Sequence, residues 1–401
     1  MTARVLTTFW RFSSGFRTPS RKIIVHLSSL QIPTATATTA SIFEPIPREE
    51  LVTKFKSRLR DRQFLPGSTG GGFPEFLAEP RDSFPLGVRV NNRNQSSLTE
   101  LTEKCMDYVE ENFPHSPAIL FRDLPAKTAE DFSIIAQAIK GKTLTYDGGT
   151  AFRTQIDKSA GTYTASIDPP SYTIEPHNEM AFNDVFPSKV FFFCLKQAAE
   201  GCGGETPLVK NKELLSKLDS AVVRKFEEKK LRYVRYLPDK SRGDYMNWQH
   251  VFFTENKEDV KPRAKQQGYS VTWDPNGDLY LWQNRDVFIH HPLTGEKIWF
   301  NQATSHNGSY YRDMPNFHGT EIPDDKFPCH TYYGDGSEIE PEALQHIRAT
   351  AWECAVGFQW RSGDLLVMDN LAVQHSRIGF TGDRKGRPGR SPTHASNTGA
   401  R

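Results

Sequence analysis

The residues of this sequence best suited to chemistry are a histidine and a glutamate two places apart, His177 and Glu179. In an extended segment, side chains two residues apart point to the same side of the chain. One imidazole and one carboxylate could therefore bind a single metal ion from one strand. A second histidine from a distant strand would complete a set that leaves coordination positions open for a co-substrate and dioxygen. This is the site type of non-haem Fe(II) oxygenases.

The neighbours of Glu179 strengthen this interpretation. A chain with 12 His and 48 Asp+Glu should contain such a pair by chance, so the pair alone would more often be a surface feature. Glu179, however, is followed by the segment 180–182 (Met-Ala-Phe) and by the phenylalanine-rich segment 190–194. A carboxylate among apolar neighbours is costly to bury unless it is paired or metal-bound. The context therefore favours a metal ligand.

The partner histidine is predicted to be His375. Gly-Asp at 363–364 and Asp-Asn at 369–370 are typical of turns, and the apolar segment 365–368 between them indicates a buried strand. The second turn would return His375 along the sheet. A lone histidine in an apolar segment is more often a core residue. His375 is therefore a candidate ligand only in combination with His177 and Glu179.

The elements that must position these residues can be predicted from periodicity and capping. Capping residues and apolar spacing predict helices over 98–113 and 128–139, and further helices are expected over 211–230 and 341–354. Short segments rich in apolar, aromatic or β-branched residues predict strands over 118–121, 231–237, 270–273, 279–283, 297–301 and 364–368. Many short strands with a few covering helices favour a mainly β fold, a double-sheet jelly roll, over an alternating βαβ fold.

The charge distribution divides the chain into a body and two ends. The 50 Lys+Arg and 48 Asp+Glu give a net charge of +2, but residues 1–43 and 384–401 each hold five bases and no acid. Residues 44–383 therefore have a net charge of −8. Basic tails do not make the basic folded face that nucleic-acid binding requires. No apolar run approaches a membrane span, and five cysteines without CxxC spacing indicate reduced thiols rather than a zinc site.

The segment 1–43 has the composition of a mitochondrial transit peptide. It is rich in Arg, Ser and Thr, and its apolar and basic residues are interspersed instead of forming the single apolar block of a secretory signal. The alternative is a disordered basic tail, in which case we expect a cytoplasmic protein.

Taken in order, five motifs resemble the TauD/TfdA family of Fe(II)- and 2-oxoglutarate-dependent dioxygenases, most closely its clavaminate synthase-like branch. The resemblance runs from about Ala118 to Arg384, within a predicted domain of residues 44–384. It implies the family's double-stranded β-helix, a jelly roll with helices on the outside. The motifs are His177-x-Glu179, Gly203-Gly-Glu-Thr-Pro207, Trp299-Phe-Asn301, Gly363-Asp364 through Asp369-Asn370, and His375-Ser-Arg377.

The resemblance also implies roles for individual residues. His177, Glu179 and His375 would bind Fe(II), with 2-oxoglutarate and O2 at the remaining positions. Thr206 matches the threonine that helps to hold a carboxylate of 2-oxoglutarate. Arg384 matches the arginine that grips the co-substrate, a task suited to the bidentate guanidinium. Lys385 and Arg387 compete with Arg384 for this role, and Arg377 is expected to face the substrate or a structural acid.

The C-terminal segment departs from the family. Residues 385–401 contain two prolines, three glycines and no aliphatic residue larger than alanine, so a disordered basic tail is predicted there. The last core strand of the family is therefore apparently missing, which would leave a neighbouring strand unpaired. We expect that this segment comes from an altered or truncated reading of a longer family member, and that 2-oxoglutarate binds weakly beside a nearly intact iron triad.

The function implied is a 2-oxoglutarate-dependent dioxygenase that oxidises a small organic molecule, usually by hydroxylation, and releases succinate and CO2. The alternative is a catalytically impaired isoform or binding protein that keeps the fold but lacks a complete 2-oxoglutarate site. A zinc hydrolase using the same triad is disfavoured because the chain has no HExxH motif and no histidine-rich cluster.

Overall fold

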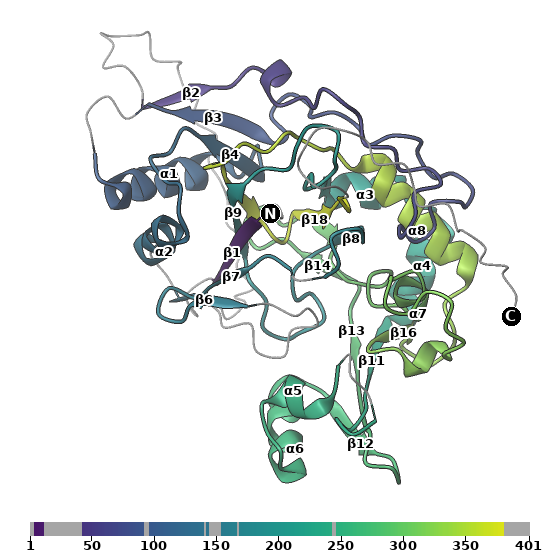
Figure 1. Cartoon of the computed structure of the whole chain (residues 1–401). Helices are drawn as coiled ribbons and strands as arrows, with labels where there is room; N and C mark the ends of the chain where they lie inside the picture. Colours follow the sequence, from purple (N-terminus) through teal and green to yellow (C-terminus); the bar gives the residue numbers. More distant parts are fainter. Residues whose placement is uncertain are drawn as a thin grey trace, which may run out of the picture.

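A computed structural model of the chain describes residues 4–11, 42–91, 96–139, 142–143, 154–166, 168–242 and 246–380 (Figure 1). Its largest sheet has nine strands, of which β5 (Lys142–Thr143) pairs only with β1. The other eight lie in the order β2 (Phe43–Pro45), β3 (Leu86–Val90), β4 (Ala118–Arg122), β17 (Leu365–Asp369), β9 (Lys189–Lys196), β1 (Arg4–Arg11), β7 (Thr162–Thr164) and β6 (Gln155–Asp157).

Three smaller sheets complete the described strands. The first, with the order β10 (Leu208–Lys210), β18 (Val373–Arg377) and β8 (Ile174–His177), carries the predicted ligands on β8 and β18. The second has the order β12 (Ser270–Trp273), β13 (Leu279–Arg285), β11 (Leu231–Leu237) and β16 (His330–Tyr333), and the third pairs β14 (Phe288–His290) with β15 (Lys297–Trp299). This mainly β architecture confirms the predicted jelly-roll class.

The helices lie outside the sheets. In Figure 1, α1 and α2 lie together beside the large sheet, α3, α4 and α8 lie on the other side of the molecule, and α5 and α6 lie at its far end with β12. Two short 3-10 helices are η1 (Arg48–Glu50) and η2 (Asp324–Lys326). The α-helices are α1 (Leu98–Asn112), α2 (Ala129–Ala138), α3 (Asn211–Lys217), α4 (Ser220–Lys229), α5 (Trp248–Phe252), α6 (Lys257–Gln266), α7 (Gly308–Arg312) and α8 (Pro341–Cys354).

The strand β9 shows how the large sheet is buried on both faces. Phe191 and Phe193 pack with residues of α1 and α2, whereas Phe192 packs into a separate apolar cluster on the opposite face. That second cluster also contains Leu208 of β10 and Val373 of β18. The large sheet and the ligand-bearing sheet therefore pack face to face, with the cluster between them.

Most of the elements agree with the sequence prediction, and one helix differs. Ser97 and Glu100 form the expected capping box at the start of α1, with Ser97 N donating to Glu100 Oε2 over 2.9 Å. The single helix expected over 211–230 is instead two helices, α3 and α4. The break occurs because Asp219 caps α4 by accepting a hydrogen bond from Ala221 N at 2.7 Å, a role for which aspartate is well suited.

Part of the N-terminal segment forms a strand that the sequence does not predict. Of residues 1–43, expected to form a transit peptide or a tail, Arg4–Arg11 make a strand in the interior of the large sheet, between β9 and β7. The sequence predicts that a core strand lacks a neighbour because the last strand of the family is missing. In the structure, N-terminal residues provide a neighbouring strand for β9. The segment suits this place because Val5, Thr7 and Thr8 are β-branched residues with high strand propensity. The tail 385–401 lies outside the described residues.

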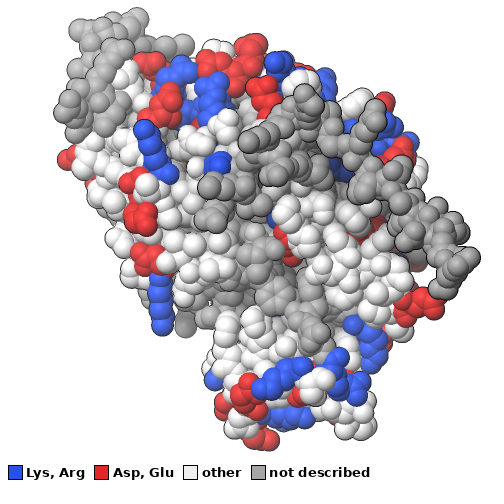
Figure 2. All heavy atoms as spheres, viewed as in Figure 1, with Lys and Arg blue, Asp and Glu red and all other residues white. Residues whose placement is uncertain are grey.

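The surface shows no single-sign charged patch on the face drawn in Figure 2, where basic and acidic side chains are interspersed over the described residues. Among the described residues, no helix has the length and apolar character needed to cross a membrane. All five cysteines are free thiols, as the sequence predicts.

Candidate metal centre

The three predicted ligands come together on two adjacent strands. His177 ends β8 and is the register partner of His375 on β18, while Glu179 follows two residues after His177. One ligand atom from each of the three residues lies within 4.8 Å of the others. The His177 and His375 rings are 4.3 Å apart, and His375 Nε2 lies 3.6 Å from Glu179 Oε2. The antiparallel pairing of β8 and β18 thus assembles the set of two histidines and one carboxylate.

The histidines have the nitrogens that a metal ion would need. His177 Nδ1 lies 2.8 Å from the carbonyl oxygen of Glu175, so that Nδ1 carries the proton and Nε2 keeps its lone pair for a metal. His375 is 5% exposed, and its Nδ1 has no hydrogen-bond partner among the residues that the structure describes. The other ring nitrogen of His375, Nε2, lies 3.6 Å from Glu179 Oε2, so a buried imidazole and a buried carboxylate face each other at a spacing that suits a shared metal ion.

A network of buried amides holds Glu179 in place. Asn370, in the turn before β18, accepts a hydrogen bond from Glu179 N at 2.7 Å and donates to Glu179 O at 3.0 Å. Asn178 donates to the carbonyls of Asn370 and Val373, and Asn211 donates to Asn178 Oδ1 at 3.2 Å. These bonds tie β8, the following turn and β18 together. The ligand-bearing backbone is therefore held by hydrogen bonds between protein groups.

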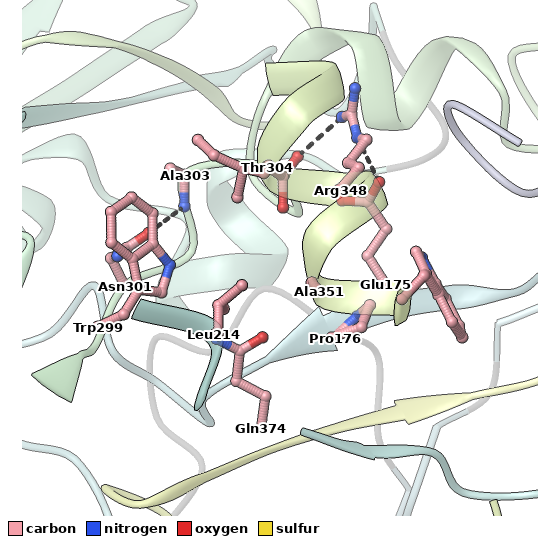
Figure 3. A pocket seen from close by; sticks show the side chains of 12 residues that line it. Glu175, Pro176, Leu214, Trp299, Asn301, Ala303, Thr304, Arg348, Ala351 and Gln374 are labelled. Atoms are coloured by element: carbon pink, nitrogen blue, oxygen red, sulfur yellow. Dashed lines mark hydrogen bonds and ion pairs between the residues drawn. The ribbon is translucent and has the colours of Figure 1, made fainter. Parts of the chain in front are cut away.

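A buried ion pair supports β8 from behind (Figure 3). Arg348 of α8 donates from Nε to Glu175 Oε1 at 2.5 Å, and from Nη2 to Thr304 O at 3.2 Å and Ser309 Oγ at 3.0 Å. Burial raises the pKa of Glu175, and the Arg348 charge opposes that effect. The cavity drawn in Figure 3 has room for about one water molecule. Because the Glu175 carbonyl binds His177, the ion pair helps to position a ligand.

A neutral histidine lies close to the predicted ligands. His306 is buried, and its ring lies 4.7 Å from that of Phe182 and 5.8 Å from that of Tyr233. Burial holds the pKa of His306 well below its usual range, and the charge of Arg235 lowers that pKa further. His306 is therefore an uncharged imidazole close to the metal ligands.

The predicted co-substrate residues are placed in part. Thr206 is buried just before β10, and its Oγ1 accepts a hydrogen bond from Trp360 Nε1 at 3.0 Å, which leaves the hydroxyl proton free to donate. Arg384, with its competitors Lys385 and Arg387, lies outside the described residues. The Arg377 guanidinium donates to the carbonyls of residues 168, 169 and 172, and the Asp168 charge acts on it, so in the described structure Arg377 ties β18 to the segment before β8.

Sequence reasoning missed three contributors to this site. The sequence predicts Asn370 as a turn residue within a family motif, and it does not predict that Asn370 holds the backbone of Glu179. Arg348 and His306 gave no local signal, because each reaches the site from a distant element of the chain. In contrast, the three residues predicted as metal ligands do lie together.

Comparison with known proteins gives concordant sequence matches. Residues 82–389 match the family model described as "Taurine catabolism dioxygenase TauD, TfdA family". The dapdiamide synthesis protein DdaC of Enterobacter agglomerans is 32% identical over 69% of this chain and 85% of its own length. A clavaminate synthase-like protein of Arabidopsis thaliana is 29% identical over 78% of this chain and 92% of its own length.

Among solved structures, the PvcB protein of Pseudomonas aeruginosa is similar over 76% of this chain and 82% of its own, with 16% identity and a TM-score of 0.41. The assignment to a family rests on the sequence matches and not on this structural likeness.

Proposed function

Because this chain belongs to the TauD/TfdA family of dioxygenases, we propose that it hydroxylates a small organic molecule at the expense of 2-oxoglutarate. As a family member it is a 2-oxoglutarate-dependent dioxygenase, and the family implies Fe(II), 2-oxoglutarate and O2 as its reactants. In the proposed reaction, one oxygen atom of O2 ends in succinate and the other in the hydroxylated substrate. The 2-oxoglutarate loses its first carbon as CO2.

The observation that carries the proposal is the arrangement of His177, Glu179 and His375 across β8 and β18, with ligand atoms within 4.8 Å of one another. Three protein ligands leave the other coordination positions of an iron ion open for co-substrate and dioxygen. When bound there, Fe(II) supplies the activation of O2 that oxidises 2-oxoglutarate and then the substrate.

The protein's own residues would orient this chemistry. The carboxylate of Glu179 balances part of the metal charge, and Asn370 fixes the backbone on both sides of that residue. The carbonyl of Glu175 keeps the Nδ1 proton of His177 in place and so holds Nε2 free for the metal. We expect the hydroxyl of Thr206, whose oxygen accepts a hydrogen bond from Trp360, to donate to a carboxylate of the co-substrate.

An assay of uncoupled turnover tests the proposal without knowledge of the substrate. Full-length protein would be supplied with Fe(II), ascorbate, O2 and 2-oxoglutarate, and succinate would be measured over time. We expect slow succinate formation from the wild type, none above background from His177→Ala, and wild-type formation from His115→Ala, which changes an exposed histidine.

If the wild type binds metal but forms no succinate, the proposal fails. That result would support the alternative of a binding protein that keeps the fold without turnover.

A further inference from the structure

The strand β1 is held on both sides by the large sheet. It pairs with β9 from Arg4↔Lys196 to Trp10↔Lys189, and with β7 through Leu6↔Thr164 and Thr7↔Tyr163. The Val5 carbonyl also accepts a hydrogen bond from Ala165 N at 3.0 Å. A strand with partners on both sides is interior to the sheet. Without it, β9 and β7 would face each other across an empty strand position.

The side chains of β1 alternate between the two faces of the sheet. Leu6 packs with Phe193 in the cluster covered by α1 and α2, whereas Val5 packs against the cluster between the two sheets. Thr7 follows the alternation and shares a face with its register partners Phe192 and Tyr163, which both belong to the inner cluster. The Thr7 side chain therefore points between the sheets.

The hydroxyl of Thr7 is a buried polar group that lacks a partner. Thr7 is 0% exposed, and its Oγ1 has no hydrogen-bond partner among the residues that the structure describes. Its neighbour Thr8 points to the opposite face and donates to the Gly161 carbonyl at 3.0 Å. An unpaired buried hydroxyl destabilises a folded protein, so such groups usually mark an unseen partner.

The position of Thr7 indicates what that partner is. The Phe192 ring, beside Thr7, lies 5.0 Å from the ring of the predicted ligand His375. The Thr7 hydroxyl is thus separated from the metal centre by one side chain, on the wall that faces β18. A hydroxyl that donates to a carboxylate forms a charge-assisted hydrogen bond, which is stronger than one between neutral groups.

We propose that Arg4–Arg11 is a permanent strand of the large sheet, on the wall that faces the predicted iron site, and that the Thr7 hydroxyl donates to the distal carboxylate of bound 2-oxoglutarate. This inference rests on the proposed function. It assigns to the N-terminal segment a place in the co-substrate site that sequence motifs do not indicate. It also requires that residues 4–11 stay with the folded protein, so processing of the segment 1–43 as a whole would open the sheet.

Substitutions at Thr7 and Thr8 form a matched pair for testing the Thr7 role. Full-length Thr7→Val, Thr7→Ser and Thr8→Val would be compared with the wild type in three measurements: the melting temperature of the metal-free protein, Fe(II) affinity, and anaerobic calorimetric affinity of the Fe(II) protein for 2-oxoglutarate. We expect Thr7→Val to keep or raise the melting temperature, to keep Fe(II) affinity, and to weaken 2-oxoglutarate about tenfold, which is about 1.4 kcal/mol. Thr7→Ser should bind 2-oxoglutarate like the wild type.

The control Thr8→Val should lower the melting temperature, because it removes the hydrogen bond to Gly161, and should leave 2-oxoglutarate affinity unchanged. If Thr7→Val binds 2-oxoglutarate within twofold of the wild type, the Thr7 inference is overturned while the proposed function stands. If the Fe(II)-loaded wild type binds no 2-oxoglutarate, both are overturned.

Hydrogen exchange tests the strand itself on the intact chain. We expect the amides of residues 4–11 to exchange as slowly as those of residues 189–196, since both segments are paired on two sides. Exchange of residues 4–11 within seconds, beside a protected β9, would overturn the strand assignment.

Discussion

The two walls that pack around the predicted iron site are built from the chain in different ways. The ligand wall, β8 and β18, is made of segments whose motifs carry the metal ligands, and amide hydrogen bonds between these segments fix them. The opposite wall joins β9 and β7 through β1, which comes from the other end of the sequence. The predicted metal ligands therefore all belong to one wall, whereas the other wall is completed by a strand that carries no sequence motif.

This difference predicts that substitutions in the two walls will have different effects. Changes in the ligand wall should act on metal binding or on the support of the ligands. Changes in the β9–β1–β7 wall should act first on folding, and on the co-substrate only through residues such as Thr7. Four predictions test this division, in order of expected size.

The largest effect is expected from His375→Ala. The substitution removes one of three predicted ligands, so it should weaken Fe(II) binding strongly. Residues that only support a ligand typically change metal affinity by about 10- to 100-fold, and we expect a larger loss here. Equilibrium dialysis of Fe(II) under nitrogen measures the change, with His115→Ala as the control. Retention of wild-type affinity in His375→Ala would show that this wall does not hold the metal.

The second effect is expected from Arg348→Met, which leaves the Glu175 carboxylate buried without its partner. Breaking a buried pair in this way should reduce the free energy of unfolding by about 3–5 kcal/mol. Urea denaturation provides the measurement. The control Lys217→Met removes an exposed partner of Glu353 and should cost at most about 1 kcal/mol. Equal effects of the two substitutions would contradict the supporting role of α8.

The third effect concerns the strand β1. Leu6 is buried in the cluster beneath α1 and α2, so Leu6→Ala should lower the free energy of unfolding by about 2–5 kcal/mol. The exposed Leu293 is the matched control, and Leu293→Ala should change stability by less than about 0.5 kcal/mol. Urea denaturation compares both variants, and an equally small change for Leu6→Ala would place β1 outside the folded core.

The smallest effect is a pH dependence from Asp364, the buried partner of Arg122 at the start of β17. Burial raises the pKa of Asp364 to about 6, against the opposing charge of Arg122. The folded protein therefore binds this proton more tightly than the unfolded chain, whose aspartates have a pKa of about 3.9. This raised pKa contributes at most about 3 kcal/mol to the free energy of unfolding. The contribution is complete below about pH 4 and is lost as the pH rises through about 6.

Asp364→Asn should remove this slope, because the amide does not titrate. Urea denaturation of both proteins at pH 4, 5, 6 and 7 measures it, and the exposed Asp123→Asn should keep the wild-type slope. A slope that persists in Asp364→Asn would assign the pH dependence to another group.

The sequence was informative wherever local pattern decides structure. The strand β11 and the helix α8 have the bounds expected from composition and from periodicity, and the three predicted ligands, indicated by motif order, lie together. The family and the jelly-roll class are confirmed as well.

The missed features all depend on contacts between distant segments. The strand β1 has an ordinary composition, and only pairing with β9 and β7 shows that it belongs to the core. The same holds for Arg348, whose partner lies 173 residues away. The roles predicted for the segment 1–43 in targeting and for Arg384 in co-substrate binding remain predictions.

The measurement that tests the account most directly is a titration of 2-oxoglutarate into the anaerobic Fe(II) protein, followed in the visible range. If the triad holds iron with open positions, a saturable charge-transfer band should appear in the wild type and be absent from His375→Ala. An Fe(II)-loaded wild type that shows no such band at any 2-oxoglutarate concentration would contradict the central claim.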